Sequence, residues 1–191
     1  SAGAVHQGGF YRFKYDITTL LKYEANNLLE VKVDKQSANA SINRAERNGD
    51  FWVMGGIYRP VYLEIVPALF IDRVAIDAKA NGAFSMDVFA MNVKAGNTIE
   101  AQVQKLNGEN VGSSFFIKAN SANEKLTVKN QFSNPDLWNP EFPKLYQVKV
   151  SIKNNGSIVH TITQRFGFRT AELRLQDGFY VNGKKVIFKG V

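Results

Sequence analysis

The sequence predicts an all-β protein built from sandwiches of short strands. Three observations support this fold class. Apolar and polar residues alternate in nearly every segment, which is the period of a strand with one buried face. No long amphipathic helix pattern interrupts that alternation. Asn-Gly pairs recur at 48–49, 81–82, 107–108, 155–156 and 182–183. Both residues tolerate the positive φ of tight turns. Short strands separated by regular turns are typical of β-sandwiches.

The first expected element is a short helical turn. Asp16 precedes the segment Ile17–Tyr23 and can cap it, with Leu20 and Leu21 facing inward. After this turn the alternation predicts strands over 28–34, 61–66, 98–106, 125–132 and 146–153. The last Asn-Gly pair predicts a hairpin between a short strand over 179–182 and the apolar run over 186–191.

Two boundaries divide the chain into three expected domains, 1–67, 68–170 and 171–191. Pro67 follows one strand and precedes a new apolar run, and a second boundary falls near Thr170. The middle segment has the size of an immunoglobulin-like sandwich, which runs to about 100 residues. The sequence stops at Val191 within an expected buried strand, so we expect a piece excised from a longer protein.

The composition restricts the classes of function. The chain has no cysteine, which excludes disulfides and thiol catalysis and fits the cytoplasm and the periplasm equally. The net charge of +7 is spread thinly over the three segments, which favours a solvated surface over a nucleic-acid partner. No apolar run approaches the roughly 20 residues needed to cross a membrane, and no signal peptide is visible, so the location stays open.

The usual motifs of catalysis and cofactor binding are absent. There is no phosphate loop, no dinucleotide fingerprint and no Gly-x-Ser-x-Gly nucleophile motif. The two histidines, His6 and His160, lie far apart without carboxylates at a recognisable spacing, so we expect no metal site and no cofactor. Several carboxylates alternate with apolar residues, which predicts a solvent-facing position for Glu30, Glu64, Asp77, Asp87 and Glu100.

The segment 48–67 is the strongest candidate for a binding site. It places Asp50 next to several aromatic residues, among them Trp52, and two adjacent glycines follow. An aromatic ring can stack on the C–H face of a sugar while a carboxylate accepts hydroxyl hydrogen bonds. The alternative is a core hairpin in which Asp50 only caps a turn. Asp50 and Trp52 are therefore candidate sugar-binding residues.

Four stretches carry a resemblance to a known family. They are GDFWVMGGIYRPVYLEI (49–65), HQGGFYRFKYDITTLLKYEANNLLEVKVD (6–34), NPDLWNPEFPKLYQVKVSI (134–152) and FGFRTAELRLQDGFYVNGKKVIFKGV (166–191). Together, in this order, they resemble glycoside hydrolase family 2, the family of β-galactosidases, β-glucuronidases and β-mannosidases. The resemblance implies a partial jelly-roll sugar-binding domain, then an immunoglobulin-like domain, then the first hairpin of a (β/α)8 barrel that is itself absent.

The same resemblance implies roles for particular residues. Asp50 matches a position near the sugar in family members, whereas Tyr58 and Arg59 match the motif with structural roles. Pro60 stands where the family often has Asp, which indicates an edge strand. The resemblance implies packing and turn roles for Trp138, Pro140, Pro143 and Tyr146. The catalytic glutamates of the family have no counterpart here, so we expect no catalytic residue and an inactive chain.

Several readings of function stay open at this stage. The first is part of a retaining glycosidase acting on β-galactosides, with β-glucuronides or β-mannosides as alternatives within the family. The others are a carbohydrate-binding module, and a structural immunoglobulin-like module without catalysis. We expect a carbohydrate partner and neither a nucleic acid nor a membrane. An exposed jelly-roll edge can also pair between chains to give a homo-oligomer.

Overall fold

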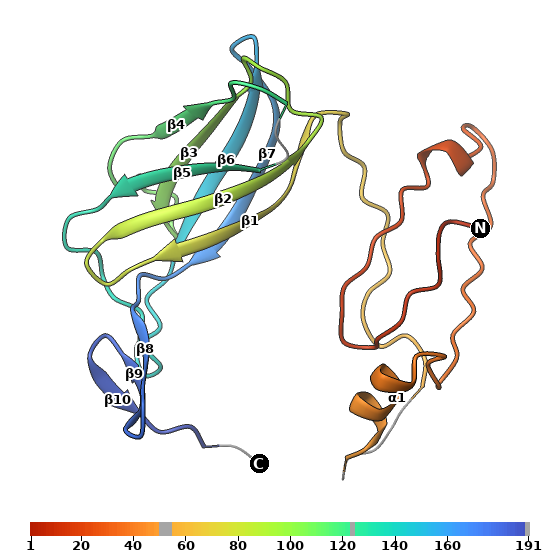
Figure 1. The fold of residues 1–191 in the computed structure, drawn as a ribbon. Coiled ribbons are helices and arrows are strands. Elements are labelled where there is room, and N and C mark those ends of the chain that lie inside the picture. The colour runs from red at the N-terminus through yellow and green to blue at the C-terminus, as the bar shows by residue number, and fades with distance from the viewer. Residues whose placement is uncertain (50–54, 123–124, 190–191) are drawn as a thin grey trace. The chain divides into compact units, whose positions relative to one another are not determined.

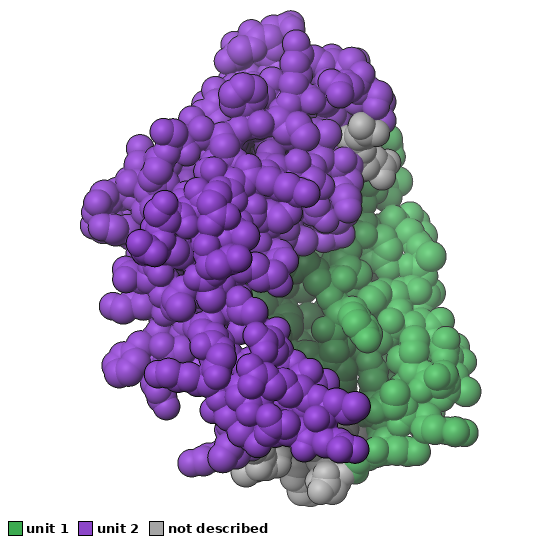
Figure 2. Space-filling view, turned by 60° about the vertical axis from the view of Figure 1, so that its left-hand side comes forward, with its two compact units in different colours: residues 1–63 green, residues 64–191 purple. Residues whose placement is uncertain are grey.

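The computed structural model describes residues 1–49, 55–122 and 125–189 of the chain. They form two compact units, Ser1–Leu63 and Glu64–Val191 (Figure 1). Figure 2 shows the two units in separate colours. The protein is nearly all-β, with antiparallel sheets. In the described ranges no helix is both long and apolar enough to cross a membrane.

The first unit contains a short 3-10 helix, η1 (Thr18–Leu20), and one α-helix, α1 (Ala40–Arg47). Asp16 is not the N-cap of η1 as predicted: the N-cap residue is Ile17, although the Asp16 carboxylate accepts a hydrogen bond from the Thr18 N–H at 2.9 Å. The prediction that Leu20 faces inward is wrong, since its side chain is 54% exposed. None of the described residues of this unit is buried.

Helix α1 was not predicted, because its residues show no apolar stripe. Hydrogen bonds at its two ends define the helix instead. The Asn39 side chain accepts hydrogen bonds from the N–H groups of Ser41 and Ile42 at 3.0 and 3.2 Å. At the other end the Asn48 N–H donates to the Arg44 carbonyl at 3.1 Å. The Asn-Gly pair at 48–49 thus follows a helix rather than joining two strands.

The second unit contains a sandwich of two antiparallel sheets. One sheet has the order β1-β2-β5 and the other the order β4-β3-β6-β7. Seven antiparallel strands in two sheets are the architecture of immunoglobulin-like domains. The strands are β1 (Phe70–Ala78), β2 (Ala83–Met91), β3 (Thr98–Lys105), β4 (Phe115–Lys118), β5 (Lys125–Gln131), β6 (Tyr146–Asn154) and β7 (Ser157–Phe166).

The core of the sandwich follows from the alternation of the sequence. Buried residues alternate with partly exposed ones along β2 and β3, so every second side chain enters the space between the sheets. Four phenylalanines pack there edge to face, with ring centroids 5.2 to 5.9 Å apart: Phe84, Phe132, Phe166 and Phe168.

Four Asn-Gly pairs form the hairpin turns that the sequence predicts. At 155–156 and 182–183 both residues have positive φ, and the flanking residues pair directly, so each is a two-residue turn. At 81–82 and 107–108 only the glycine has positive φ, and the asparagine side chain accepts from the backbone N–H two residues on. These two are three-residue turns in which a type I turn precedes the glycine.

A third sheet, β10-β9-β8, follows the sandwich: β8 (Ala171–Arg174), β9 (Gly178–Val181) and β10 (Lys184–Val186). Asn182 in its turn connects it to the sandwich. Its side chain accepts from the Thr170 N–H at 2.9 Å and donates to the Trp138 carbonyl at 2.9 Å. The Asn182 N–H also donates to the Thr170 carbonyl at 2.8 Å.

Three predicted strands differ from the structure. Segments 28–34 and 61–66 are not strands, and the run over 186–191 is a strand only as far as Val186 within its described part. A strand needs a neighbour that satisfies its backbone N–H and C=O groups, and alternation alone does not supply one. The proposed division into 1–67, 68–170 and 171–191 stays a prediction.

Candidate functional site

The two candidate sugar-binding residues, Asp50 and Trp52, lie outside the residues that the structure describes. In the described part of the first unit, hydrogen bonds connect three separate stretches. These are the segment His6–Gly9, helix α1 and the segment that contains Tyr58. The structure shows how these three stretches are connected.

Gly9 lies where the stretches meet. Its N–H donates to the Glu46 carboxylate of α1 at 2.8 Å, and its carbonyl accepts from the Tyr58 hydroxyl at 3.1 Å. The structure therefore joins two of the stretches that carry the family resemblance, 6–34 and 49–65, through Gly9 and Tyr58. The Arg59 guanidinium lies over the Tyr58 ring at 5.4 Å from its centroid, so one face of that ring is covered.

Polar side chains continue from this junction toward the start of α1. The Gln7 side-chain carbonyl accepts from the Ser37 hydroxyl at 2.8 Å and from the Asn39 N–H at 2.9 Å. The side-chain oxygen of Asn43 is buried and has no hydrogen-bond donor in the described residues. A ligand hydroxyl or a water molecule could satisfy this oxygen. Neither Asn43 nor Glu46 could be identified from the sequence, because both lie in helix α1, which was not predicted.

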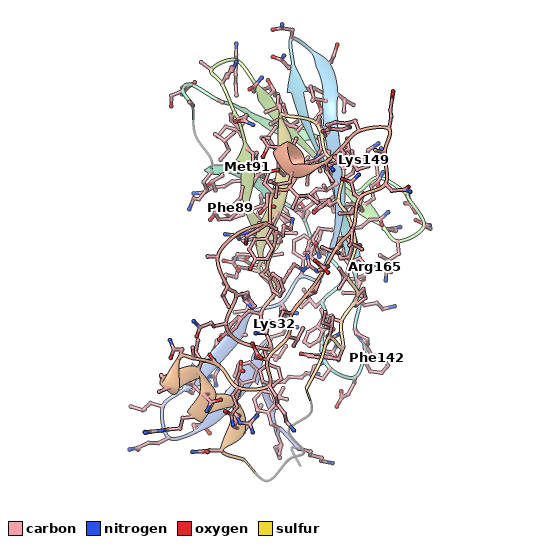
Figure 3. The ribbon with its side chains drawn as sticks, turned by 90° about the vertical axis from the view of Figure 1, so that its right-hand side faces the viewer. Lys32, Phe89, Met91, Phe142, Lys149 and Arg165 are labelled. Carbon is pink, nitrogen blue, oxygen red and sulfur yellow. The ribbon has the colours of Figure 1, made fainter. Side chains whose placement is uncertain are left out.

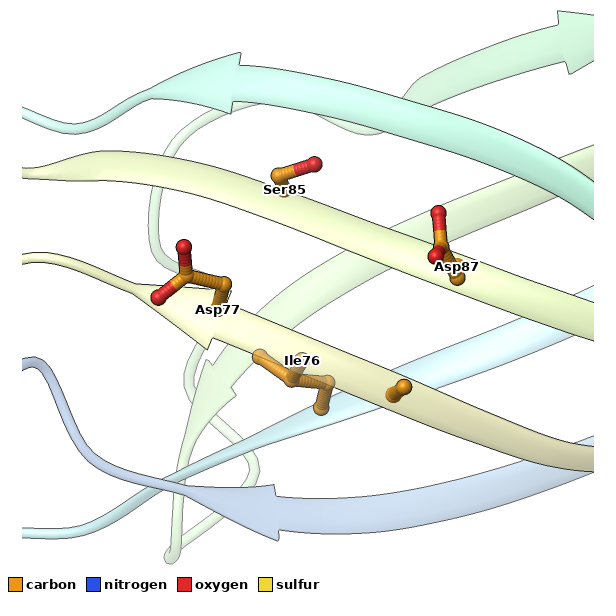
Figure 4. Close-up of a pocket in the computed structure, with 5 residues that line it drawn as sticks. Ile76, Asp77, Ser85 and Asp87 are labelled. Atoms are coloured by element: carbon orange, nitrogen blue, oxygen red, sulfur yellow. The ribbon is translucent and has the colours of Figure 1, made fainter.

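The second unit has an open groove of about 320 Å³ on the outer face of β1 and β2 (Figure 4). Asp77, Ser85 and Asp87 line it together with Ala75 and Ile76. Asp77 forms an ion pair with Lys79 at 2.9 Å. Both carboxylates lie on the outer face, as the sequence predicts.

Asp87 is held in its ionised form. The Thr127 hydroxyl donates to its carboxylate at 2.6 Å and the Lys125 ammonium lies 3.0 Å away. These two partners lower the pKa of Asp87 below its usual value. A general acid for glycoside hydrolysis needs the opposite, a raised pKa, so this groove lacks the features of a glycosidase active site.

The stretch with Trp138 and Pro143 has a packing role. The Trp138 N–H donates to the Phe168 carbonyl at 2.9 Å, and the Arg169 guanidinium lies 4.7 Å from the Trp138 ring. Tyr146 is buried, and its hydroxyl accepts from the Asp136 N–H at 2.9 Å. A second open groove, of about 300 Å³, runs beside Tyr146. Across the described residues, no three His, Cys, Asp or Glu side chains gather as metal ligands would.

A sequence profile described as Glycosyl hydrolases family 2 matches residues 66–169, the region of the sandwich. The chain is 32% identical over 97% of its length to a protein of Formosa agariphila named as a β-glucuronidase, and covers 22% of that protein. It is 29% identical, again over 97% of its length, to a β-galactosidase of Thermoanaerobacter pseudethanolicus, of which it covers 26%.

Among solved structures, a family 2 member from Bacteroides cellulosilyticus DSM 14838 resembles the chain with a TM-score of 0.73 at 24% identity. The likeness covers 93% of this chain and 25% of that structure. The chain therefore shares its fold with that protein, and it spans about a quarter or less of the proteins named here.

Proposed function

Because the chain belongs to glycosyl hydrolase family 2, we propose that it supplies the sugar-binding and immunoglobulin-like parts of a retaining β-glycosidase that acts on β-galactosides. In this proposal the nucleophile and the general acid/base belong to a catalytic domain outside these 191 residues. A carboxylate nucleophile forms a glycosyl-enzyme intermediate, which water then hydrolyses with help from the acid/base residue.

The observation that carries this proposal is the position of the family match, on residues 66–169. The coverage of the relatives, 22% and 26%, is also that of a non-catalytic part.

We assign a sugar contact to the segment with Asp50 and Trp52. The Asp50 carboxylate accepts hydrogen bonds from hydroxyls of the terminal sugar, and the Trp52 ring stacks on its C–H face. The polar side chains of Gln7, Glu46 and Asn43 support this assignment, because they supply hydrogen-bonding groups in the same unit.

The test compares the complete product of the gene with the 191-residue chain. Both are assayed on nitrophenyl β-galactoside, β-glucuronide and β-mannoside. We expect hydrolysis of the β-galactoside by the complete product and none by the chain alone. Asp50→Asn should raise KM or lower kcat, whereas Asp34→Asn, an exposed carboxylate of the same unit, should change neither. Hydrolysis by the 191-residue chain would overturn the non-catalytic role.

A β-glucuronidase is the second candidate, favoured by the 32% identity to the Formosa agariphila protein. The same panel of substrates distinguishes the two. If the complete product hydrolyses the β-glucuronide and neither of the other substrates, the proposed substrate changes from a β-galactoside to a β-glucuronide. The proposed role of this chain stays the same.

A further inference from the structure

The two sheets of the sandwich differ in charge. Strands β1, β2 and β5 carry three basic and three acidic residues, so their sheet is neutral. Strands β3, β4, β6 and β7 carry five basic residues and one acidic residue, Glu100. Along the sequence the basic residues are spread thinly, but folding places most of those in the sandwich strands on one sheet.

The outward side chains of β3, β6 and β7 around Lys149 form a surface that we call the basic face. Lys149 pairs in register with Gln102 of β3 on one side and with Thr163 of β7 on the other. Two residues earlier on β6, Gln147 pairs in register with Gln104 of β3 and with Arg165 of β7. Figure 3 labels Lys149 and Arg165 on their strands.

Lys149 and Arg165 have no acidic partner in the part of the chain that the structure describes. The one carboxylate of these strands, Glu100, is paired with Lys153. Lys105, at the end of β3, is paired with Glu109. Lys149 and Arg165 are both exposed and are diagonal neighbours on adjacent strands, a spacing of about 7–8 Å.

Amides and hydroxyls surround these two cations. The Gln147 amide donates to the Gln104 side chain at 3.5 Å, and Gln104 donates to Asn110 at 2.9 Å. The Ser151 and Thr161 hydroxyls are hydrogen-bonded to each other at 2.8 Å. On the edge strand β4, Phe116 is 72% exposed and pairs in register with Glu100 of β3. The face thus offers fixed charges, ordered amides and an open aromatic ring.

We propose that the basic face binds an acidic polysaccharide through the carboxylates of its uronic acid residues. Lys149 and Arg165 pair with two carboxylates, Gln102 and Gln147 exchange hydrogen bonds with hydroxyls, and Phe116 stacks on a sugar ring. Lys149 and Arg165, with the exposed Lys118 of β4 as a third cation of this sheet, neutralise few phosphates, so the face suits a sparsely charged glycan better than a nucleic acid. This site lies on the sandwich and does not depend on the function proposed for Asp50.

The experiment titrates the 191-residue chain with tetragalacturonate and follows backbone amide signals by NMR. We expect shifts confined to β3, β4, β6 and β7, with affinity that falls as salt rises from low to physiological concentration. Lys149→Gln or Arg165→Gln should each weaken binding about tenfold, as expected for a lost hydrogen bond to a charged group. The double variant should show no measurable binding.

The matched control is the double variant Lys129→Gln with Lys184→Gln. It removes two exposed lysines that lie on other sheets, so the net charge changes equally. It should bind tetragalacturonate as the parent does. Neutral cellotetraose, a chain of the same length, should not bind. Unperturbed spectra with millimolar tetragalacturonate would overturn the proposal. An equal loss of affinity in the control variant, or equal binding of cellotetraose, would also overturn it. Tighter binding of oligo-uridylate than of tetragalacturonate would point to a nucleic acid instead and overturn it too. The dispersed amide spectrum of each variant shows that it is folded.

Discussion

Asp87 illustrates how a single carboxylate can be recognised as structural rather than catalytic. Its carboxylate accepts a hydrogen bond from the Thr127 hydroxyl of the neighbouring strand β5. It also forms an ion pair with Lys125, which lies on β5 as well. Each oxygen of the carboxylate thus has one of these partners, and both partners favour its ionised form. The sequence predicts its solvent-facing position from alternation, but its partners come from a strand about 40 residues further on.

The pKa of Asp87 leads to a prediction about pH. Because the folded state holds this pKa below its unfolded value, the carboxylate stabilises the fold above the unfolded pKa, and this contribution is lost as pH falls through the folded pKa. Asp87→Asn should therefore lower the thermal unfolding midpoint at pH 7 and have a smaller effect at pH 3. Asp77→Asn, which removes a carboxylate paired only with Lys79, is the control and should change little. An equal loss at both pH values would contradict the prediction.

At the scale of elements, the attachment of the third sheet depends on one turn residue. Asn182 and Asn155 both occupy the first position of a two-residue turn, with φ of 50° and 48°. Only Asn182 adds side-chain hydrogen bonds that reach Thr170 and Trp138. The two turns have the same backbone conformation, so they separate the effect of the side chain from the effect of the backbone.

Asn182→Gly should destabilise the protein by about 1–3 kcal/mol, because it leaves two partly buried backbone groups without partners while keeping the turn conformation. Asn155→Gly should change the free energy of unfolding by less than about 0.5 kcal/mol. Denaturant unfolding of both variants measures the difference. Equal effects would mean that the Asn182 side chain contributes nothing to the attachment.

Alternation in the sequence predicted three strands of the sandwich, β3, β5 and β6, and each of them has its partner strand within the chain. Thr98–Lys105 and Tyr146–Asn154 fall within a residue of their predicted bounds and pair with each other. The same pattern over 28–34 gave a wrong prediction, since no neighbouring strand pairs with it in the described residues. Helix α1 escaped prediction because hydrogen bonds at its ends, and not an apolar face, define it.

The candidate site was less predictable than the fold. The stretches 6–34 and 49–65 were recognised by their resemblance to the family, and the structure connects them through Gly9 and Tyr58. The roles of Asp50 and Trp52 stay predictions. The basic face was missed because strand register, which sequence alone does not fix, decides which lysines share a surface.

At the scale of the whole molecule, the two units differ in burial. No described residue of Ser1–Leu63 is buried, whereas the second unit encloses a core of more than a dozen side chains. Brief digestion with trypsin should therefore cut first at basic residues of the first unit, such as Lys35, Arg44 and Arg47, and leave a fragment that begins at Asn48, because trypsin does not cleave the Arg59–Pro60 bond. Mass spectrometry of the fragments measures this. Early cuts within the sandwich, at Lys149 or Lys153, would contradict it.

The unequal charges of the two sheets also make the sandwich an electric dipole across its own thickness. Near a negatively charged surface, such a body turns so that the positive side leads. On a cation-exchange matrix the molecules would thus settle with one orientation, and the neutral sheet, with its groove at Asp77 and Asp87, would point away from the support. A label or linker attached on that sheet would remain accessible after immobilisation.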